Sequence, residues 1–476
     1  MKTNLRIFKH TFTVLSIMCC LLLGSTTIIY ALSDLDSDLI FNSANNTRSS
    51  SKINEGVQPS NTTDNTSTIS TIDSNTPTTS TSESNTPSTA TSDSSASATA
   101  TSESDTSATS TSSDQVGTTQ EQAPPSKVVP PASITISAVG DLMVHQSNLN
   151  NAYNPKTGTY DFNGFLEYVK PYLSKSDLTI GNFETITAGS KSGYTSYPSF
   201  NTPDAMLTAL SNAGFDVLST ANNHCLDRGI SGLTRTIQKI KDNKMANVGS
   251  SIDGKNKYIT KEINGIKVSI LSYSSFFNGN DAKLSAKQKI NYLSIINENQ
   301  IKSDIKAVKA NGTDATIVIL HWGTEYQRMP NTTQTSLSKK ILSWGADAIL
   351  GSHPHVIQKS ELVKVNDKNK FVIYSMGNFI SGYRRLDKAK RPNKIYTEDG
   401  VIVQLQIEKD TKGGVIIKKV DYIPTWVDKN YVNNRPVFKI IPIPSTNITG
   451  SYITDYNRNS IKQSYKNTMS IMAKLN

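Results

Sequence analysis

Short apolar runs alternate with segments of helical hydrophobic spacing from residue 134 onward. Runs of four to eight apolar residues are typical of buried strands, and apolar residues three or four apart are typical of helices packed on them. We expect strands at 134–139, 178–180, 215–219, 315–320, 346–350, 371–375, 401–407 and 415–420. The alternation of the two patterns predicts a mixed α/β body.

The expected helices connect these strands. Apolar residues at helical intervals predict one helix over 162–173 and another over 230–240. A third begins with Thr202 as its N-cap and ends at Gly214, since glycine commonly terminates a helix. Asn264 and Gly265 lie between two alternating segments and predict a hairpin turn, because Asn-Gly readily supplies the two positive φ angles.

Two segments without this pattern precede the body. Residues 1–32 place three basic residues before an uncharged, largely apolar stretch, the order of an export signal. The stretch is long enough to remain as a membrane anchor, and cleavage near residue 31 is the alternative. In both cases the positive amino-terminal end predicts an extracytoplasmic body, either membrane-anchored or secreted.

Residues 33–133 are rich in Ser and Thr, and contain four ten-residue repeats beginning at residue 71. No repeat has an apolar face, so ordering the chain would cost entropy without burying apolar surface, which predicts a disordered linker. The expected organisation is thus a signal peptide or signal anchor (1–32), the linker (33–133), a globular domain (134–430) and a basic C-terminal extension (431–476). Within the extension, 452–474 is expected to form an exposed helix.

Charge is distributed unevenly along the chain. Residues 1–32 contribute +3 and residues 33–133 contribute −9 to the formal net charge of +10, so residues 134–476 carry +16. Such a basic body favours anionic partners. With three cysteines in the chain, neither a disulfide framework nor a cysteine zinc cluster is expected. No Gly-rich phosphate loop occurs, and we expect no nucleic-acid partner.

Five of the six histidines lie within a few residues of the carboxyl end of an expected strand: His145, His224, His321, His353 and His355. Asp141 and Glu184 follow two further strands at the same kind of position. Ligands of open α/β sheets bind beyond the carboxyl ends of the strands, so these side chains are expected to converge. Imidazole and carboxylate without thiolate form the ligand set of hydrolytic zinc, manganese or iron sites.

The pair His353 and His355 is the sharpest part of this pattern. In extended backbone, residues two apart point the same way, so both imidazoles are expected to reach one site. The number of candidate ligands exceeds four, and Glu184 can bridge through both oxygens, which favours two divalent ions over one. Cys225, beside His224, is expected to be a small buried filler, with a nucleophilic role as the alternative.

Six motifs in order resemble the CapA family of poly-γ-glutamate capsule synthesis proteins. They are Gly140-Asp141, Gly181-Asn182-Phe183-Glu184, Asn222-Asn223-His224, His321-Trp322-Gly323-Thr324-Glu325, Gly351-Ser352-His353-Pro354-His355-Val356 and Ser375-Met376-Gly377-Asn378-Phe379. The resemblance implies a calcineurin-like metallophosphoesterase fold, a sandwich of two sheets flanked by helices.

The resemblance also implies roles for individual residues. Asp141 and His355 would bind a first metal, and Glu184 would bridge to a second. That second metal would be bound by Asn223, His321 and His353. His224 would act as general acid or hold the oxyanion as the leaving group departs. His145 departs from the family pattern of Asp-x-His, because it lies four residues after Asp141, and it is only a candidate ligand.

Two functions from different classes follow. The first is a metal-dependent hydrolase that cleaves phosphoester or related bonds in an anionic envelope polymer or its phosphorylated precursor. The second is a non-catalytic assembly factor that holds a polyanion and acts with the capsule synthesis machinery. Both belong to capsule synthesis or export outside the cytoplasm, with membrane contact through residues 1–32 if these are not cleaved.

Overall fold

The structure is a computed structural model, and it describes residues 131–255, 257–385, 392–410, 414–432, 435–445 and 450–473. The expected signal segment and nearly all of the expected linker lie outside these residues. In the described part of the chain, no helix is long and apolar enough to cross a membrane.

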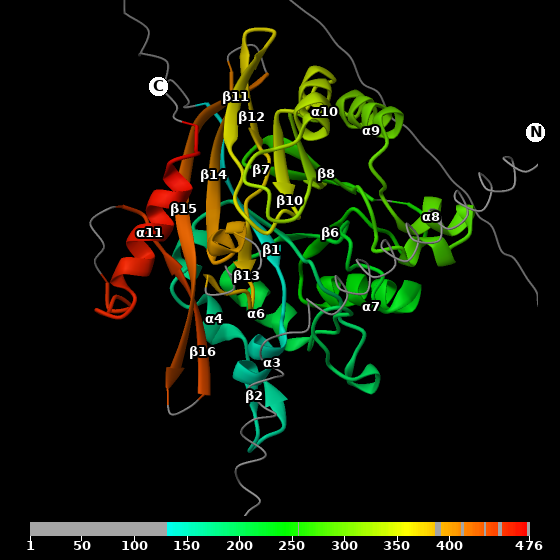
Figure 1. The fold of residues 1–476 in the computed structure, drawn as a ribbon. Coiled ribbons are helices and arrows are strands. Elements are labelled where there is room, and N and C mark those ends of the chain that lie inside the picture. The colour runs from blue at the N-terminus through cyan, green and yellow to red at the C-terminus, as the bar shows by residue number, and fades with distance from the viewer. Residues whose placement is uncertain are drawn as a thin grey trace, which may run out of the picture. The chain divides into compact units, whose positions relative to one another are not determined.

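Two sheets form the centre of the body (Figure 1). The first has the strand order β16-β15-β14-β1-β4-β5-β6, with β13 paired to β1. Its strands are β1 (Ser133–Leu142), β4 (Leu178–Asn182), β5 (Val217–Ser219), β6 (Ala246–Val248), β13 (Asn378–Ile380), β14 (Asp399–Lys409), β15 (Val415–Val432) and β16 (Arg435–Pro442). Strands β1, β4, β5 and β6 run parallel, so their carboxyl ends lie at one edge of the sheet.

The second sheet has the order β11-β12-β10-β9-β8-β7. Its strands are β7 (Ile259–Ile263), β8 (Ile266–Ser274), β9 (Ala315–His321), β10 (Ala348–Ser352), β11 (Ser360–Val365) and β12 (Lys368–Ile373). Strands β8, β9, β10 and β12 are parallel. Asn264 and Gly265 turn the β7–β8 hairpin with φ of 48° and 75°, as expected.

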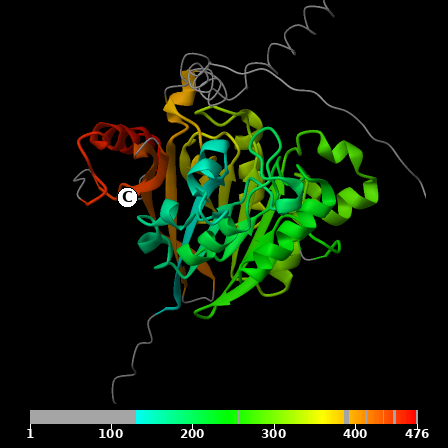
Figure 2. The same cartoon turned by 90° about the horizontal axis from the view of Figure 1, so that it is seen from below.

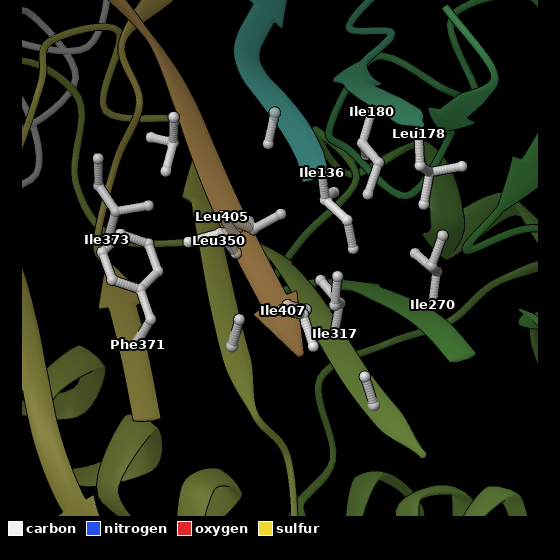
Figure 3. Close-up of a cluster of buried hydrophobic side chains, with 14 of the residues drawn as sticks. Ile136, Leu178, Ile180, Ile270, Ile317, Leu350, Phe371, Ile373, Leu405 and Ile407 are labelled. Carbon is white, nitrogen blue, oxygen red and sulfur yellow. The ribbon is translucent and has the colours of Figure 1, made fainter. Parts of the chain in front are cut away.

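An apolar core fills the space between the sheets. Ile136, Leu178 and Leu405 of the first sheet pack with Ile317 and Leu350 of the second (Figure 3). Burying apolar area of this kind contributes roughly 25 cal/mol per Å², and here it also fixes the two sheets against each other. The predicted two-sheet α/β sandwich is therefore confirmed.

Helices cover the outer faces of the sheets (Figure 2). They are α3 (Gln146–Ala152), α4 (Asn163–Leu166), α5 (Lys170–Leu173), α6 (Ala205–Ala213), α7 (Gly229–Asp242), α8 (Ala286–Tyr292), α9 (Glu298–Ala310), α10 (Thr332–Ser343) and α11 (Arg458–Met469). Short 3-10 turns occur at η1 (Ser190–Ser192), η2 (Asn280–Lys283) and η4 (Pro392–Tyr396), and β2 (Tyr153–Asn154) pairs with β3 (Thr159–Tyr160).

Two expected helices differ in detail. The helix expected over 162–173 is divided into α4 and α5, because Pro171 belongs in the first turn of a helix and is disfavoured in an interior. The helix expected to begin after Thr202 begins at Ala205. The Thr202 hydroxyl bonds that of Thr185 at 2.7 Å and so does not cap the helix.

The C-terminal segment is part of the fold. The boundary expected at residue 430 falls inside β15, and β16 extends the same sheet beyond it. Helix α11 is not fully exposed as expected, since Ile461 is buried against Trp426 and Ile441. Tyr465 and Met469 of the same helix are partly buried against the body as well.

Candidate metal centre

The candidate ligands come from the carboxyl ends of strands in both sheets. Asp141 belongs to the end of β1, Glu184 follows β4, Asn223 and His224 follow β5, His321 ends β9, and His353 and His355 follow β10. All seven side chains are buried. The predicted convergence at the strand ends is confirmed, with the refinement that the cluster lies where the edges of the two sheets meet.

Two glycines allow the backbones to approach at this point. A Cβ on Gly140 would lie 1.9 Å from the carbonyl oxygen of Gly377, and the amide of Asp141 donates to that oxygen at 2.9 Å. Gly377 has a φ of 69°, a conformation that other residues rarely adopt. Gly140 and Gly377 are thus required by the backbone that positions Asp141.

Glu184 lies at the centre of the cluster. Its Oε1 is 3.7 Å from Nε2 of His321 and 3.7 Å from Nε2 of His355. Neither carboxylate oxygen has a hydrogen-bond partner among the described residues, although the side chain is completely buried. Burial, followed by the charge of Asp141, raises the pKa of Glu184 well above its usual value. A buried carboxylate without partners is costly for the protein alone, and a cation would remove that cost.

His355 is oriented as a metal ligand should be. Its Nδ1 lies 3.2 Å from Asp141 Oδ2 and 3.1 Å from Asn378 Oδ1. The Asn378 amide nitrogen donates to Thr397, so its oxygen faces the imidazole. With two acceptors at Nδ1, that nitrogen carries the proton and Nε2 is free to bind a metal. Burial lowers the pKa of His355, but the hydrogen bond and charge of Asp141 outweigh it and raise the value overall.

His321 and Asn223 meet on another side of Glu184. Nε2 of His321 is 2.9 Å from Asn223 Oδ1, and the amide nitrogen of Asn223 donates to Asn278 at 3.3 Å. Nδ1 of His321 faces the amide nitrogen of Asn182 at 3.2 Å and the hydroxyl of Ser352 at 3.1 Å, and both can donate to it, so in the metal-free protein the ring proton is on Nε2, toward Asn223. Burial, then the neighbouring His353, lowers the pKa of His321 well below its usual value, so it is a neutral ligand candidate.

The expected extended backbone at His353-Pro354-His355 is wrong. His353 has a φ of 97° and His355 a φ of 55°, so both lie in the left-handed region. The two imidazoles nevertheless reach Glu184 together, through a strained loop and not through strand alternation. Burial lowers the pKa of His353 to about 3, and its Nδ1 has no partner among the described residues.

These residues fit a divalent metal by their chemistry. One group that could hold an ion is Asp141, Glu184 and His321, and another is Glu184, His353 and His355. The groups share Glu184, in keeping with a bridging carboxylate. They divide the other ligands differently from the arrangement that the resemblance implies, because Asp141 groups with His321. Nitrogen and oxygen donors suit zinc, manganese and iron, and the individual ligand assignments stay predictions.

His224 is held by a carboxylate that the sequence analysis did not single out. Its Nδ1 lies 2.8 Å from Asp227 Oδ2, and that carboxylate also accepts from the amide of Phe200 at 2.7 Å. The pairing directs Nδ1 to Asp227 and leaves Nε2 for proton transfer. The adjacent Cys225 is buried in an apolar cluster, and burial raises the pKa of its thiol to about 12, which confirms the filler interpretation.

His145 is not in either candidate metal group. Its Nδ1 accepts from the backbone amide of Gly382 at 3.0 Å. The candidate role as a ligand, expected from its spacing after Asp141, is therefore not favoured by the geometry. Three residues intervene between Asp141 and His145, because β1 continues to Leu142 before the chain turns into α3, and this carries His145 away from the position of an Asp-x-His ligand.

Three further polar residues were missed by the sequence analysis. Asn182 donates to Asp141 at 2.8 Å and lies 3.2 Å from His321, so it joins ligands from the two sheets. Ser352 and Asn378 contact His321 and His355. All three lie inside the quoted motifs, and this position could have identified them as site residues. For Asp227, the sequence offered only its position three residues after His224.

The fold and the buried cluster define a two-sheet α/β protein with a candidate divalent-metal centre. Residues 135–383 match the family described as bacterial capsule synthesis protein PGA_cap. The chain therefore belongs to this family, as the motifs predicted.

Two curated relatives come from Bacillus. Capsule biosynthesis protein CapA of Bacillus anthracis is 30% identical over 286 residues, covering 58% of this chain and 64% of that protein, which is just under two thirds. PGA biosynthesis protein CapA of Bacillus subtilis (strain 168) is 26% identical over 323 residues, covering 64% of this chain and 77% of that protein.

Solved structures with similarity to this chain include a phosphoesterase and a nucleotidase. The calcineurin-like phosphoesterase YfkN from Bacillus subtilis has 15% identity and a TM-score of 0.40, covering 72% of this chain and 99% of that chain. The NAD nucleotidase NadN of Haemophilus influenzae has 13% identity and a TM-score of 0.39, covering 72% of this chain and 63% of that chain.

Proposed function

We propose that this protein is a metal-dependent hydrolase of capsule synthesis that acts outside the cytoplasm on a phosphoester or related bond of an anionic envelope polymer or its precursor. The observation that carries the proposal is the completely buried Glu184 carboxylate, which has no hydrogen-bond partner in the described part of the chain and lies among the imidazoles of His321, His353 and His355. Family membership supports the link to capsule synthesis.

A divalent ion bound here would lower the pKa of a coordinated water toward 7 and polarise the bond to be cleaved. The residues of the chain would then share three tasks. Asp141 and the imidazole of His355 hold each other in position through their 3.2 Å contact. Asn182 and Ser352 orient His321. His224, supported by Asp227, would give a proton from Nε2 to the leaving group.

The net charge of the body also supports an anionic substrate. Residues 134–476 carry a formal charge of +16, which follows from the contributions of +3 and −9 by the preceding segments to the total of +10. A positive body raises the local concentration of anions and speeds their association, most strongly at low ionic strength. The same charge would serve a non-catalytic polyanion-binding factor, so charge alone does not separate the two functions.

Hydrolysis assays of the purified full chain test the proposal. The protein would be loaded with Mn²⁺ or Zn²⁺ and offered a phosphomonoester, a phosphodiester and a γ-linked glutamate oligomer. We expect cleavage of at least one substrate class by wild type and by Glu262→Gln, an exposed control, but not by Glu184→Gln. Equal rates for wild type and Glu184→Gln would reject this site as the source of activity. No cleavage by metal-loaded wild type would favour the assembly factor.

A further inference from the structure

His145 is held in one tautomer by the backbone. The amide of Gly382 donates to Nδ1 at 3.0 Å, and a backbone amide can act only as a donor. Nδ1 is therefore unprotonated, and the proton of the neutral ring is on Nε2. His145 is fixed at its own backbone as well, since its amide donates to Asn148 Oδ1 at 2.9 Å. Gly382 cannot carry a side chain here, because a Cβ would lie 2.6 Å from that of His145.

This tautomer is opposite to the one at His355. There the acceptors Asp141 and Asn378 hold the proton on Nδ1 and leave Nε2 unprotonated for a metal. At His145, Nε2 is a donor and cannot ligate a cation while Nδ1 accepts from Gly382. The same nitrogen is buried and has no hydrogen-bond partner in the described protein, and the residue is only 6% exposed.

The surroundings of His145 place it beside the reacting groups. Its ring centroid lies 5.5 Å from that of Phe200, whose ring lies 4.7 Å from that of His224. On another side, the ring is 4.8 Å from that of Tyr383, which is 5.8 Å from that of His355. His145 thus lies between the candidate proton donor and a candidate metal ligand, one aromatic ring away from each.

We propose that His145 contacts the substrate, with its Nε2–H donating to an anionic oxygen bound at the metal centre. This inference rests on the proposed function. The oxygen belongs to a phosphoryl or a carboxylate group, because a negative oxygen satisfies the donor most strongly. Lys394, with Nζ 5.4 Å from the Tyr383 ring centroid, adds positive charge on the same side. Burial, then the charges of His355 and His224, lowers the pKa of His145 to about 3, so the ring remains a neutral donor.

Two substitutions distinguish the roles of the two ring nitrogens of His145. His145→Asn can retain an acceptor near Nδ1 but has no donor at the position of Nε2, whereas His145→Gln can place an amide N–H there. In the Mn²⁺-loaded full chain, we expect both variants to keep the wild-type metal content. His145→Asn should weaken binding of inorganic phosphate about 10- to 100-fold, the range typical of a lost hydrogen bond to a charged group. His145→Gln should recover part of that loss.

The binding experiment has clear contrary outcomes. Loss of metal from His145→Asn, with His145→Gln also depleted, would make His145 a ligand and overturn the proposal. Unchanged phosphate and γ-glutamate oligomer binding in His145→Asn, with metal retained, would make it a structural residue and also overturn it. Weakened binding of the oligomer alone would support the donor role and identify the bound oxygen as a carboxylate.

Nitrogen NMR of the imidazole rings tests the tautomer without any substrate. In the ¹⁵N-histidine-labelled full chain, the resonances absent from His145→Asn are those of His145. We expect a protonated Nε2 and an unprotonated Nδ1, and the reverse pattern would overturn the proposal. If the tautomer and phosphate binding are as expected but no substrate is hydrolysed, the proposed catalytic function fails while the donor role stands.

Discussion

Asp141 and His355 contact each other across the two sheets, with 3.2 Å between Oδ2 and Nδ1. Asp141 lies at the end of β1 in the first sheet, and His355 follows β10 in the second. The geometry of the candidate centre therefore depends on how the sheets pack. The apolar core between them positions the site as well as stabilising the fold.

The first prediction concerns the proton donor. His224→Ala should lower turnover by about 10²- to 10⁴-fold, the usual contribution of general acid catalysis, and leave metal content unchanged. Asp227→Asn should lower turnover as well, because it removes the carboxylate that directs Nδ1. Steady-state kinetics and metal analysis of the same samples provide the check. Wild-type turnover in His224→Ala would remove it from the mechanism.

The second prediction concerns protons released when metal binds. Burial raises the pKa of Glu184, so in the metal-free protein this group holds its proton to higher pH than an unfolded glutamate does. Metal binding requires the carboxylate and should release that proton, and metal affinity should fall as the pH is lowered. His353, with its pKa lowered to about 3, is already neutral and should release none.

Calorimetric titration in two buffers of different ionisation enthalpy measures this release. Wild type should release more protons than Glu184→Gln, and removal of His353 should leave the Glu184 proton release in place. The stability of the metal-free protein depends on pH in the opposite direction to metal affinity. Because the pKa of Glu184 is raised in the folded state, its contribution to the free energy of unfolding declines as the pH rises from about 4.5 through that pKa. Equal proton release by wild type and Glu184→Gln would contradict the buried, protonated carboxylate.

The third prediction concerns the C-terminal helix α11. Ile461 is completely buried, so Ile461→Ala should lower the free energy of unfolding by about 2–5 kcal/mol. The neighbouring Lys462 is exposed, and Lys462→Ala should change it by about 0.5 kcal/mol or less. Urea denaturation measures both. Equal small effects would mean that α11 does not pack on the sheet in solution.

Loss of α11 packing should also disturb the loop beside the candidate metal centre. Asn467 on α11 donates to Asp399 at 2.7 Å, and Arg385 pairs with the same carboxylate. Arg385 follows closely on Gly382 and Tyr383, which contact His145. The segment beyond the residue range of the family match thus supports the loop beside the candidate centre.

The apolar runs were sufficient to predict an α/β body and the meeting of the ligands, because buried parallel strands have strong apolar runs and their carboxyl ends share an edge. The arrangement as a two-sheet sandwich was predicted from the resemblance of the motifs to a known family. The sequence was not sufficient for the details of the loops. Alternation along a strand could not describe His353 and His355, since left-handed φ angles arise from the packed loop and leave no periodic signal. The role of His145 depends on a hydrogen bond to Gly382, 237 residues away, which no local pattern contains.

The metal content of wild type and Glu184→Gln, measured by elemental mass spectrometry after purification of the full chain, tests the central claim most directly. A neutral amide cannot replace the shared carboxylate, although it is nearly the same size and should fold without the buried charge. We expect wild type to retain one or two divalent ions per chain and Glu184→Gln to lose at least one of them. Equal metal content in two well-folded proteins, or no metal in wild type after reconstitution, would contradict a metal centre built around Glu184.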